Sequence, residues 1–166
     1  MRRIDVGGVA IVAIDGACVG HDFERALDAD IRLADATATF GADGVADVEG
    51  CARRLTRLLG EARAKEIVLG GRPFDAAAAL RLGVVTRVLP PGELGDAVTV
   101  LADTLAALPP LAVRAVREAV RATRDLTPDA GLALEHAHFT RLIASRDHKA
   151  AVEAFFERRT AVFTGE

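Results

Sequence analysis

The chain has 166 residues, enough for a domain with a sizeable core. Apolar residues make up 51% and charged residues 27%, which is typical of a globular protein and excludes a disordered one. The formal net charge of −3 argues against a nucleic-acid-binding surface. No apolar run is long enough to span a membrane, and Cys18 and Cys51 offer neither a disulfide framework nor zinc-ligand spacing. We therefore expect a cytoplasmic protein that binds no metal.

Apolar runs separated by glycine turns predict that the first half mixes strands and helices. The run over residues 7–14 is bounded by glycines and predicts a buried strand. Helix signals follow from Asp22, a plausible N-cap, to about Asp28. The further expected elements are strands over 30–34 and 38–41, a loop over 42–49, helices over 50–59, 61–69 and 75–82, and a strand over 84–89.

The second half is predicted to be helical. The expected helices cover 93–107, 110–124, 128–145 and 147–158. Ser145 or Asp147 could cap the last of them. Because few strands come first and helices follow, we expect one α/β domain over 1–166, with an α/β core part over 1–90 and a helical region over 91–166.

The segment from Val9 to Glu24 has the most informative pattern. An apolar run enters a glycine turn and continues as a helix that carries a carboxylate, Glu24, near its start. Such a layout directs backbone N–H groups, a helix N-terminus and one acid toward the same small volume. This combination suits a developing oxyanion beside a proton-transfer group.

Four segments, in order and at near-correct spacing, resemble the enoyl-CoA hydratase/isomerase (crotonase) family over about Ile4 to Phe163. These segments are Ala13–Glu24 (A-x-x-G-x-x-x-G-G-G-x-E in the family), Asp30–Gly41 (D-I-x-x-A…F-G), Leu55–Val88 (L-x-R-x-x-G…G-L-V) and Asp147–Arg159 (the closing D-x-x-E-G…F-x-E-K-R helix). The resemblance implies a ClpP/crotonase α/β fold with a helical C-terminal trimerisation region. It also implies an N-terminally truncated member that lacks the leading strands.

Members of this family bind a thioester carbonyl with two backbone N–H groups and move a proton with a glutamate. Carried over to this chain, the resemblance implies that Glu24 is catalytic and that the Gly20–His21 turn offers one N–H group. Its substrate would be a coenzyme A or acyl-carrier thioester, without a prosthetic group. The alternative for Glu24 is a solvated first-turn glutamate favoured by the helix dipole.

His21 and Asp22 stand where the family has glycines. They could form a replacement acid–base pair beside Glu24. In the simpler alternative, Asp22 caps the helix and His21 fills space in the turn. His136 and His138 are two positions apart on an expected helix, so they point to different faces and are expected to be surface or interface residues without a shared metal.

The second glutamate of the family's hydratases, in an F-G-x-P-E motif, falls here at Gly44. Asp43, Asp47 and Glu49 lie nearby, but none is in register. Since hydration needs one group for the water and one for the α-carbon proton, we expect isomerisation, dehydration or decarboxylation by a single acid rather than hydration. The alternatives are a non-catalytic subunit that supports a partner enzyme and a remnant that binds coenzyme A esters.

Arg158 and Arg159 occupy positions where the family's last helix places basic residues near coenzyme A. They could equally be solvated charges at a helix end, and the three arginines Arg53, Arg54 and Arg57 have the same two interpretations. Loss of leading strands would expose a sheet edge. We therefore expect a homo-oligomer, a trimer or hexamer, or a hetero-oligomer whose other subunit supplies the missing part.

Overall fold

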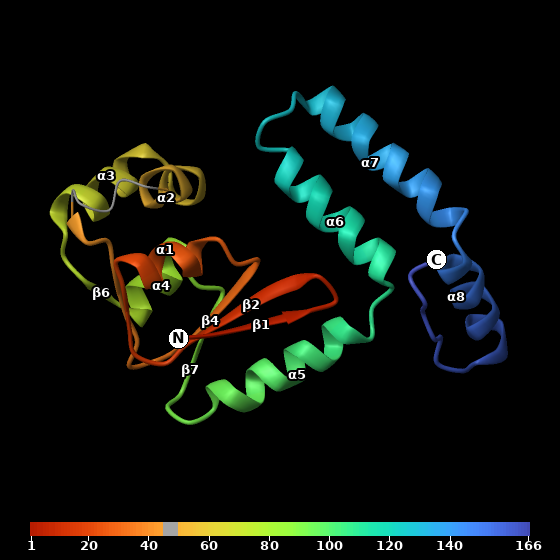
Figure 1. The fold of residues 1–166 in the computed structure, drawn as a ribbon, viewed down its shortest axis with the longest axis horizontal. Coiled ribbons are helices and arrows are strands. Elements are labelled where there is room, and N and C mark those ends of the chain that lie inside the picture. The colour runs from red at the N-terminus through yellow and green to blue at the C-terminus, as the bar shows by residue number, and fades with distance from the viewer. Residues whose placement is uncertain (45–49) are drawn as a thin grey trace. The chain divides into compact units, whose positions relative to one another are not determined.

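The structure is a computed structural model that describes residues 1–44 and 50–166 (Figure 1). The chain forms two compact units, Met1–Ala102 and Asp103–Glu166. The first contains all the strands of the described residues together with helices, and the second is helical. This follows the predicted order of strands first and helices afterwards.

The larger sheet of the first unit has the strand order β1-β2-β4-β7. These strands are β1 (Arg2–Val6), β2 (Val9–Ile14), β4 (Ile31–Asp35) and β7 (Arg87–Leu89). β1 and β2 form an antiparallel hairpin, whereas β2–β4 and β4–β7 are parallel pairs. Gly7 and Gly8 make the hairpin turn with φ values of 57° and 81°, a backbone that glycine adopts without a steric penalty.

The second sheet has the order β3-β5-β6 and leads directly to the most informative turn of the sequence. Its strands are β3 (Ala17–Val19), β5 (Thr39–Gly41) and β6 (Phe74–Asp75). β3 runs parallel to β5, with Val19 opposite Gly41, and β5 runs antiparallel to β6. The sequence did not predict β1, β3 or β6, and the strand expected over 84–89 is confined to β7.

The helices of the first unit are α1 (His21–Leu27), α2 (Cys51–Leu59), α3 (Glu61–Gly70), α4 (Ala76–Leu82) and α5 (Leu94–Ala106), the last of which crosses into the second unit. The expected ends of α2 and α4 at Gly60 and Gly83 are confirmed. The expected cap of α1 is wrong: Gly20 is the N-cap, and Asp22 lies inside the first turn.

The core of the first unit holds the site elements together. All six residues of β2 are buried. Phe23 of α1, Phe40 of β5 and Phe74 of β6 form an aromatic cluster, with ring centroids 5.8 to 6.2 Å apart. Edge-to-face and stacked contacts at such distances add to the burial of apolar area. Helix α1 is therefore anchored against the second sheet by its own side chain.

The second unit consists of the end of α5 and of α6 (Pro110–Ala122), α7 (Pro128–Ile143) and α8 (Arg146–Glu157). Ser145 caps α8 by accepting a hydrogen bond from the His148 N–H at 3.1 Å. Asp147 is instead buried and accepts hydrogen bonds from the N–H groups of Thr164 and Gly165. Of the two cap candidates, Ser145 is thus the one used.

Both His136 and His138 were expected to be surface or interface residues; His136 is exposed, whereas His138 is not at the surface of the chain. His138 is buried against α6, with its Nε2 atom 3.7 Å from a carboxylate oxygen of Glu118.

Among the described residues, no single helix is long and apolar enough to cross a membrane; the pair α5 and α6 meets those limits only when both are counted together across a bend.

Candidate active site

The turn between β3 and α1 is built around Gly20. Its φ and ψ are 56° and −127°, a conformation that side chains make unfavourable. The Gly20 N–H donates to the Gly41 carbonyl at 3.0 Å, and the Gly20 carbonyl accepts from the Glu24 N–H at 3.0 Å. The sheet and the helix thus fix the backbone on both sides of Gly20.

The first turn of α1 has backbone N–H groups that helix geometry leaves without an intrahelical acceptor. They belong to His21, Asp22 and Phe23, since the Glu24 N–H is the first to reach back to Gly20. Gly20 has no side chain that could cap them. Free donors at a helix N-terminus are suited to a developing negative charge, so the N–H of His21 remains available for the role predicted from the sequence.

The side chain of Glu24 lies beside this turn, largely shielded from solvent and in contact with two basic residues. It is only 19% exposed. One carboxylate oxygen, Oε1, accepts a hydrogen bond from Nη1 of Arg54 at 2.9 Å, and the other, Oε2, lies 3.6 Å from Nδ1 of His21. Glu24 is therefore not the freely solvated first-turn residue of the simpler interpretation.

The side chains of His21 and Asp22 are directed differently from the expected cap and filler. The imidazole of His21 is 80% exposed, so it does not fill space in the turn, although its Nδ1 atom stays near Glu24. Asp22 is 52% exposed and lies 3.9 Å from Arg25. The structure thus brings His21 and Glu24 together, and Asp22 contacts the next turn of its own helix.

Arg54 of α2 is a site residue whose partner the sequence did not reveal. It joins Glu24 and, through Nη2, the Oδ1 atom of Asp28 at 3.3 Å. Gly50, the N-cap of α2, has a φ of 119° and lies so close that a Cβ there would be 2.3 Å from Arg54 Nη1 and 2.6 Å from Glu24 Oε1. In the sequence, the glycine directly before a helix that carries arginines is the signal that could have indicated this close approach.

Asp43 also lies at the turn, although it is one position out of the family's register. Its Cβ would be 3.5 Å, and its Oδ2 3.8 Å, from a Cβ placed on Gly20. The parallel register of Val19 with Gly41 explains this contact, because the chain leaving β5 runs beside the chain leaving β3. Asp47 and Glu49, the other nearby acids, lie outside the described residues.

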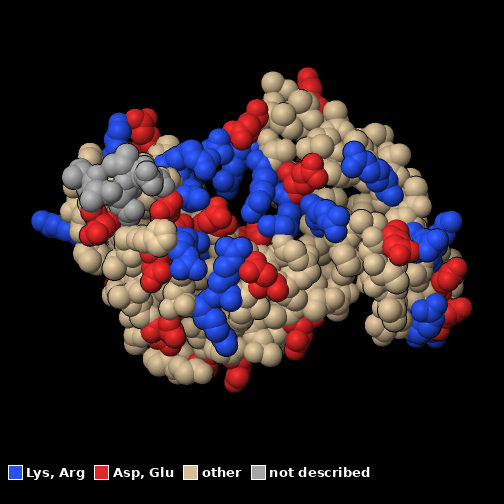
Figure 2. All heavy atoms as spheres, in the orientation of Figure 1, with Lys and Arg blue, Asp and Glu red and all other residues tan. Residues whose placement is uncertain are grey.

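Arg158 and Arg159 belong to the second unit. Arg158 ends α8 in a left-handed conformation, with a φ of 54°, and Arg159 pairs with Glu157. Both are exposed. Figure 2 shows acidic and basic side chains interspersed over the face in view. A role in binding coenzyme A stays a prediction for these two residues.

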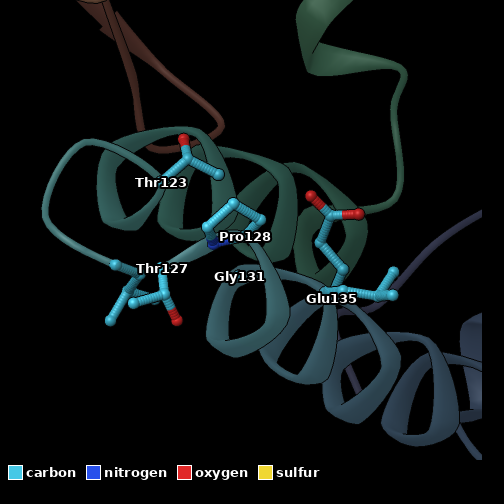
Figure 3. Close-up of a pocket in the computed structure, with 7 residues that line it drawn as sticks. Thr123, Thr127, Pro128, Gly131 and Glu135 are labelled. Atoms are coloured by element: carbon cyan, nitrogen blue, oxygen red, sulfur yellow. The ribbon is translucent and has the colours of Figure 1, made fainter.

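The second unit also has a pocket at the turn between α6 and α7 (Figure 3). It is lined by Thr123, Leu126, Thr127, Pro128, Gly131, Leu132 and Glu135. Glu135 is its one ionisable side chain, and this lining has no partner for proton transfer. Within residues 1–44 and 50–166, no group of three or more His, Cys, Asp or Glu side chains could hold a metal ion.

Comparison with known proteins identifies the family of this chain. A model of the enoyl-CoA hydratase/isomerase family matches residues 2–166, and the chain belongs to that family. The short-chain-enoyl-CoA hydratase of Clostridium acetobutylicum is 32% identical over 153 residues, which cover 90% of this chain and 59% of the relative. The 2,3-dehydroadipyl-CoA hydratase of Escherichia coli (strain K12) is 33% identical over 159 residues, 93% of this chain and 62% of the relative.

The fold is shared with solved structures. Enoyl-CoA hydratase subunit I of Geobacillus kaustophilus HTA426 superposes with a TM-score of 0.86 at 38% identity, over 94% of this chain and 62% of that chain. The predicted α/β fold of the crotonase type, with its helical C-terminal region, is confirmed. The chain spans about three fifths of the length of the relatives it matches.

Cys18 lies in the core behind the turn, and burial, reinforced by the Asp22 carboxylate, raises the pKa of its thiol from 9.0 to about 12. The folded state therefore keeps a proton that the unfolded chain releases above pH 9. Stability due to this thiol is fully present below pH 9 and is lost as the pH rises toward 12.

We expect the free energy of unfolding of the wild type to decrease more steeply above pH 9 than that of Cys18→Ala, by at most about 1.4 kcal/mol per pH unit. Urea unfolding between pH 8 and 11 measures both slopes. Parallel slopes for the two proteins would show that the thiol is not protected by burial.

Proposed function

We propose that this chain forms a thioester site of the enoyl-CoA hydratase/isomerase type and that it acts on an acyl-CoA or acyl-carrier thioester. The observation that carries the proposal is the pairing of uncapped N–H groups at His21–Phe23 with the enclosed carboxylate of Glu24 in one turn of α1. An oxyanion and a moving proton need these two elements side by side.

The proposed mechanism divides the work between backbone and side chain. The thioester oxygen accepts a hydrogen bond from the His21 N–H while its carbonyl carbon and the neighbouring α-carbon become an enolate. The Glu24 carboxylate takes the α-proton, and returning it at a different carbon completes a double-bond isomerisation with no net loss of atoms. Preorganised donors of this kind are worth about 10²–10³-fold in rate each, and general acid–base catalysis a similar factor.

Decarboxylation passes through the same enolate and ends with protonation of the α-carbon by the same acid, so it remains within this proposal. Dehydration also remains if Glu24 takes the α-proton and gives it to the leaving hydroxyl group, which departs as water. His21, with Nδ1 at 3.6 Å from Glu24, is placed to exchange the proton between that carboxylate and solvent. Asp22 contributes negative charge near the helix start. Arg158 and Arg159 would bind phosphate groups of coenzyme A through charge-assisted hydrogen bonds of their guanidinium groups.

Hydration is the second candidate, and the position of Asp43 favours it. A second carboxylate beside Gly20 could activate the water that a single acid leaves without a base. The relatives from Clostridium acetobutylicum and Escherichia coli bear hydratase names. A non-catalytic subunit that supports a partner enzyme is the remaining alternative, and it predicts no effect of either acid on turnover.

Replacing Glu24 by Gln tests the catalytic proposal. We expect kcat on enoyl-CoA substrates to fall by about 10²-fold or more, since the amide cannot accept the proton. Calorimetric Kd values for acetyl-CoA and crotonyl-CoA should change less than about threefold, because the backbone donor remains. Glu66→Gln, in an exposed ion pair with Arg63 on α3, is the matched control. Full activity of Glu24→Gln would contradict a catalytic role.

Replacing Asp43 by Asn separates hydration from isomerisation. If Asp43 activates water, hydration of crotonyl-CoA decreases by about 10²-fold while isomerisation of a β,γ-unsaturated thioester continues. Both reactions are followed by the absorbance of the conjugated thioester. Asp96→Asn, an exposed first-turn carboxylate of α5, serves as the control. Equal hydration rates for Asp43→Asn and the wild type would leave the single-acid mechanism.

We also propose that the helices of the second unit mediate assembly, as a homo-trimer or hexamer, with hetero-oligomerisation as the alternative. Large apolar side chains are strongly exposed on all three of these helices: Val116 (62%), Val120 (61%), Leu132 (68%), Phe139 (59%), Phe155 (78%) and Phe156 (77%). Exposed apolar groups at this density are typical of interaction surfaces.

The double substitution Phe155→Glu and Phe156→Glu is expected to lower the native mass to that of a monomer, as measured by light scattering. Leu69→Glu, at a residue of α3 that is 68% exposed, should leave the mass unchanged. A wild-type mass of one chain in the absence of any partner would exclude the homo-oligomer, and co-purification from the native source would then identify a second subunit.

A further inference from the structure

The contact between Glu24 and Arg54 links two helices at the proposed reaction centre. Arg54 reaches from α2 to α1 and contacts a carboxylate at each end of that short helix, Glu24 in the first turn and Asp28 at the C-cap. The Glu24 contact is the shorter one, at 2.9 Å against 3.3 Å. It is also the more enclosed, because the Glu24 side chain is 19% exposed and that of Asp28 is 60% exposed.

Gly50 lies directly beside the contact between Glu24 and Arg54. A side chain at this position would collide with Nη1 of Arg54 and with Oε1 of Glu24, the two atoms that form the hydrogen bond. The φ of 119° at Gly50 is independently unfavourable for any other residue. The start of α2 can therefore approach the ion pair closely only because this residue is glycine.

This arrangement makes the two oxygens of Glu24 unequal. Oε1 accepts the hydrogen bond from Arg54 beside Gly50, whereas Oε2 lies 3.6 Å from Nδ1 of His21. A charge-assisted hydrogen bond restricts rotation of the carboxylate about its last bond. A carboxylate held in this way presents one oxygen in one direction, which a proton-transfer group requires.

We propose that Arg54 is a positioning residue that, together with Gly50, holds Glu24 so that Oε2 is the oxygen that exchanges the proton. This inference rests on the proposed function of the same site. Arg54 itself touches neither substrate nor the moving proton. Its effect is therefore on kcat, through the orientation of Glu24, and not on the affinity for the thioester.

The alternative is an ion pair that only joins α1 to α2. Kinetics and chemical rescue separate the two roles, because a purely structural arginine influences folding and leaves the reaction of the folded protein unchanged. The experiment uses the full chain in whichever oligomeric form it has. Its variants are Arg54→Ala, Arg54→Lys and, as the matched control, Arg63→Ala from the exposed pair with Glu66 on α3.

For Arg54→Ala we expect kcat to fall by about 10- to 100-fold with KM within about twofold of wild type, since small misplacement of a reacting group costs rate at this scale. Guanidinium ion at low millimolar concentration should restore part of kcat, and Arg54→Lys should retain an intermediate rate. Arg63→Ala should match the wild type. An Arg54→Ala protein that is folded, as judged by circular dichroism, and has the wild-type kcat would overturn the proposal.

A double-mutant cycle of Glu24 and Arg54, measured by thermal unfolding, tests the contact independently of turnover. If Glu24 and Arg54 are coupled, the decrease in Tm of the variant that carries both Glu24→Gln and Arg54→Ala is smaller than the sum of the two single decreases. Additive decreases would overturn the contact. A wild-type chain without turnover on any thioester would overturn the proposed function, and the positioning role of Arg54 with it, even where the cycle shows coupling.

Gly50→Ala provides a second route to the same conclusion. The added methyl group displaces Arg54 from Glu24 without removing either charge. We expect a decrease in kcat similar to that of Arg54→Ala. Gly60→Ala, at another positive-φ glycine next to α2 with no atom near the Cβ position, is the control for backbone strain alone. Equal kcat values for Gly50→Ala and Gly60→Ala would contradict the role assigned to this glycine.

Discussion

The parallel pairing of β3 with β5 is the constraint on which the site depends. Val19 stands opposite Gly41, and the Gly20 N–H extends the ladder by donating to the Gly41 carbonyl at 3.0 Å. This bond fixes the point at which the chain leaves the sheet and begins α1. Because Phe23 packs into the aromatic cluster with Phe40 and Phe74, the direction of the helix is fixed as well. The uncapped donors and Glu24 then follow from helix geometry.

The two acids at the turn, Glu24 and Asp43, differ in solvent exposure and in their charged neighbours. Glu24 is enclosed and held by a guanidinium group, whereas Asp43 is exposed and reaches the turn from the segment that follows β5. An enclosed, oriented carboxylate is suited to repeated transfer of one proton, and an exposed one to contact with water. Within the proposed function, the choice between isomerisation and hydration therefore depends on Asp43 rather than on Glu24.

Much of the fold could be predicted because its signals are local. Helices α2, α3 and α4 end at glycines where the sequence places them, and Ser145 caps α8. The missed strands β3 and β6 are only three and two residues long and exist through pairing with β5, which no local pattern encodes. The predicted N-cap of α1 was wrong for a related reason. Asp22 has the chemistry of a cap, but the sheet sets the start of the helix two residues earlier, at Gly20.

The sequence by itself determined the order of the elements, the glycine turn and the acid that follows it, because turn residues, apolar periodicity and helix breakers act within a few residues of each other. Tertiary structure alone decided which groups surround Glu24. Arg54 and Gly50 are distant in the chain, and Asp43 lies out of the motif's register. They reach the site because α2 packs against α1 and because parallel strands bring the ends of separate segments together.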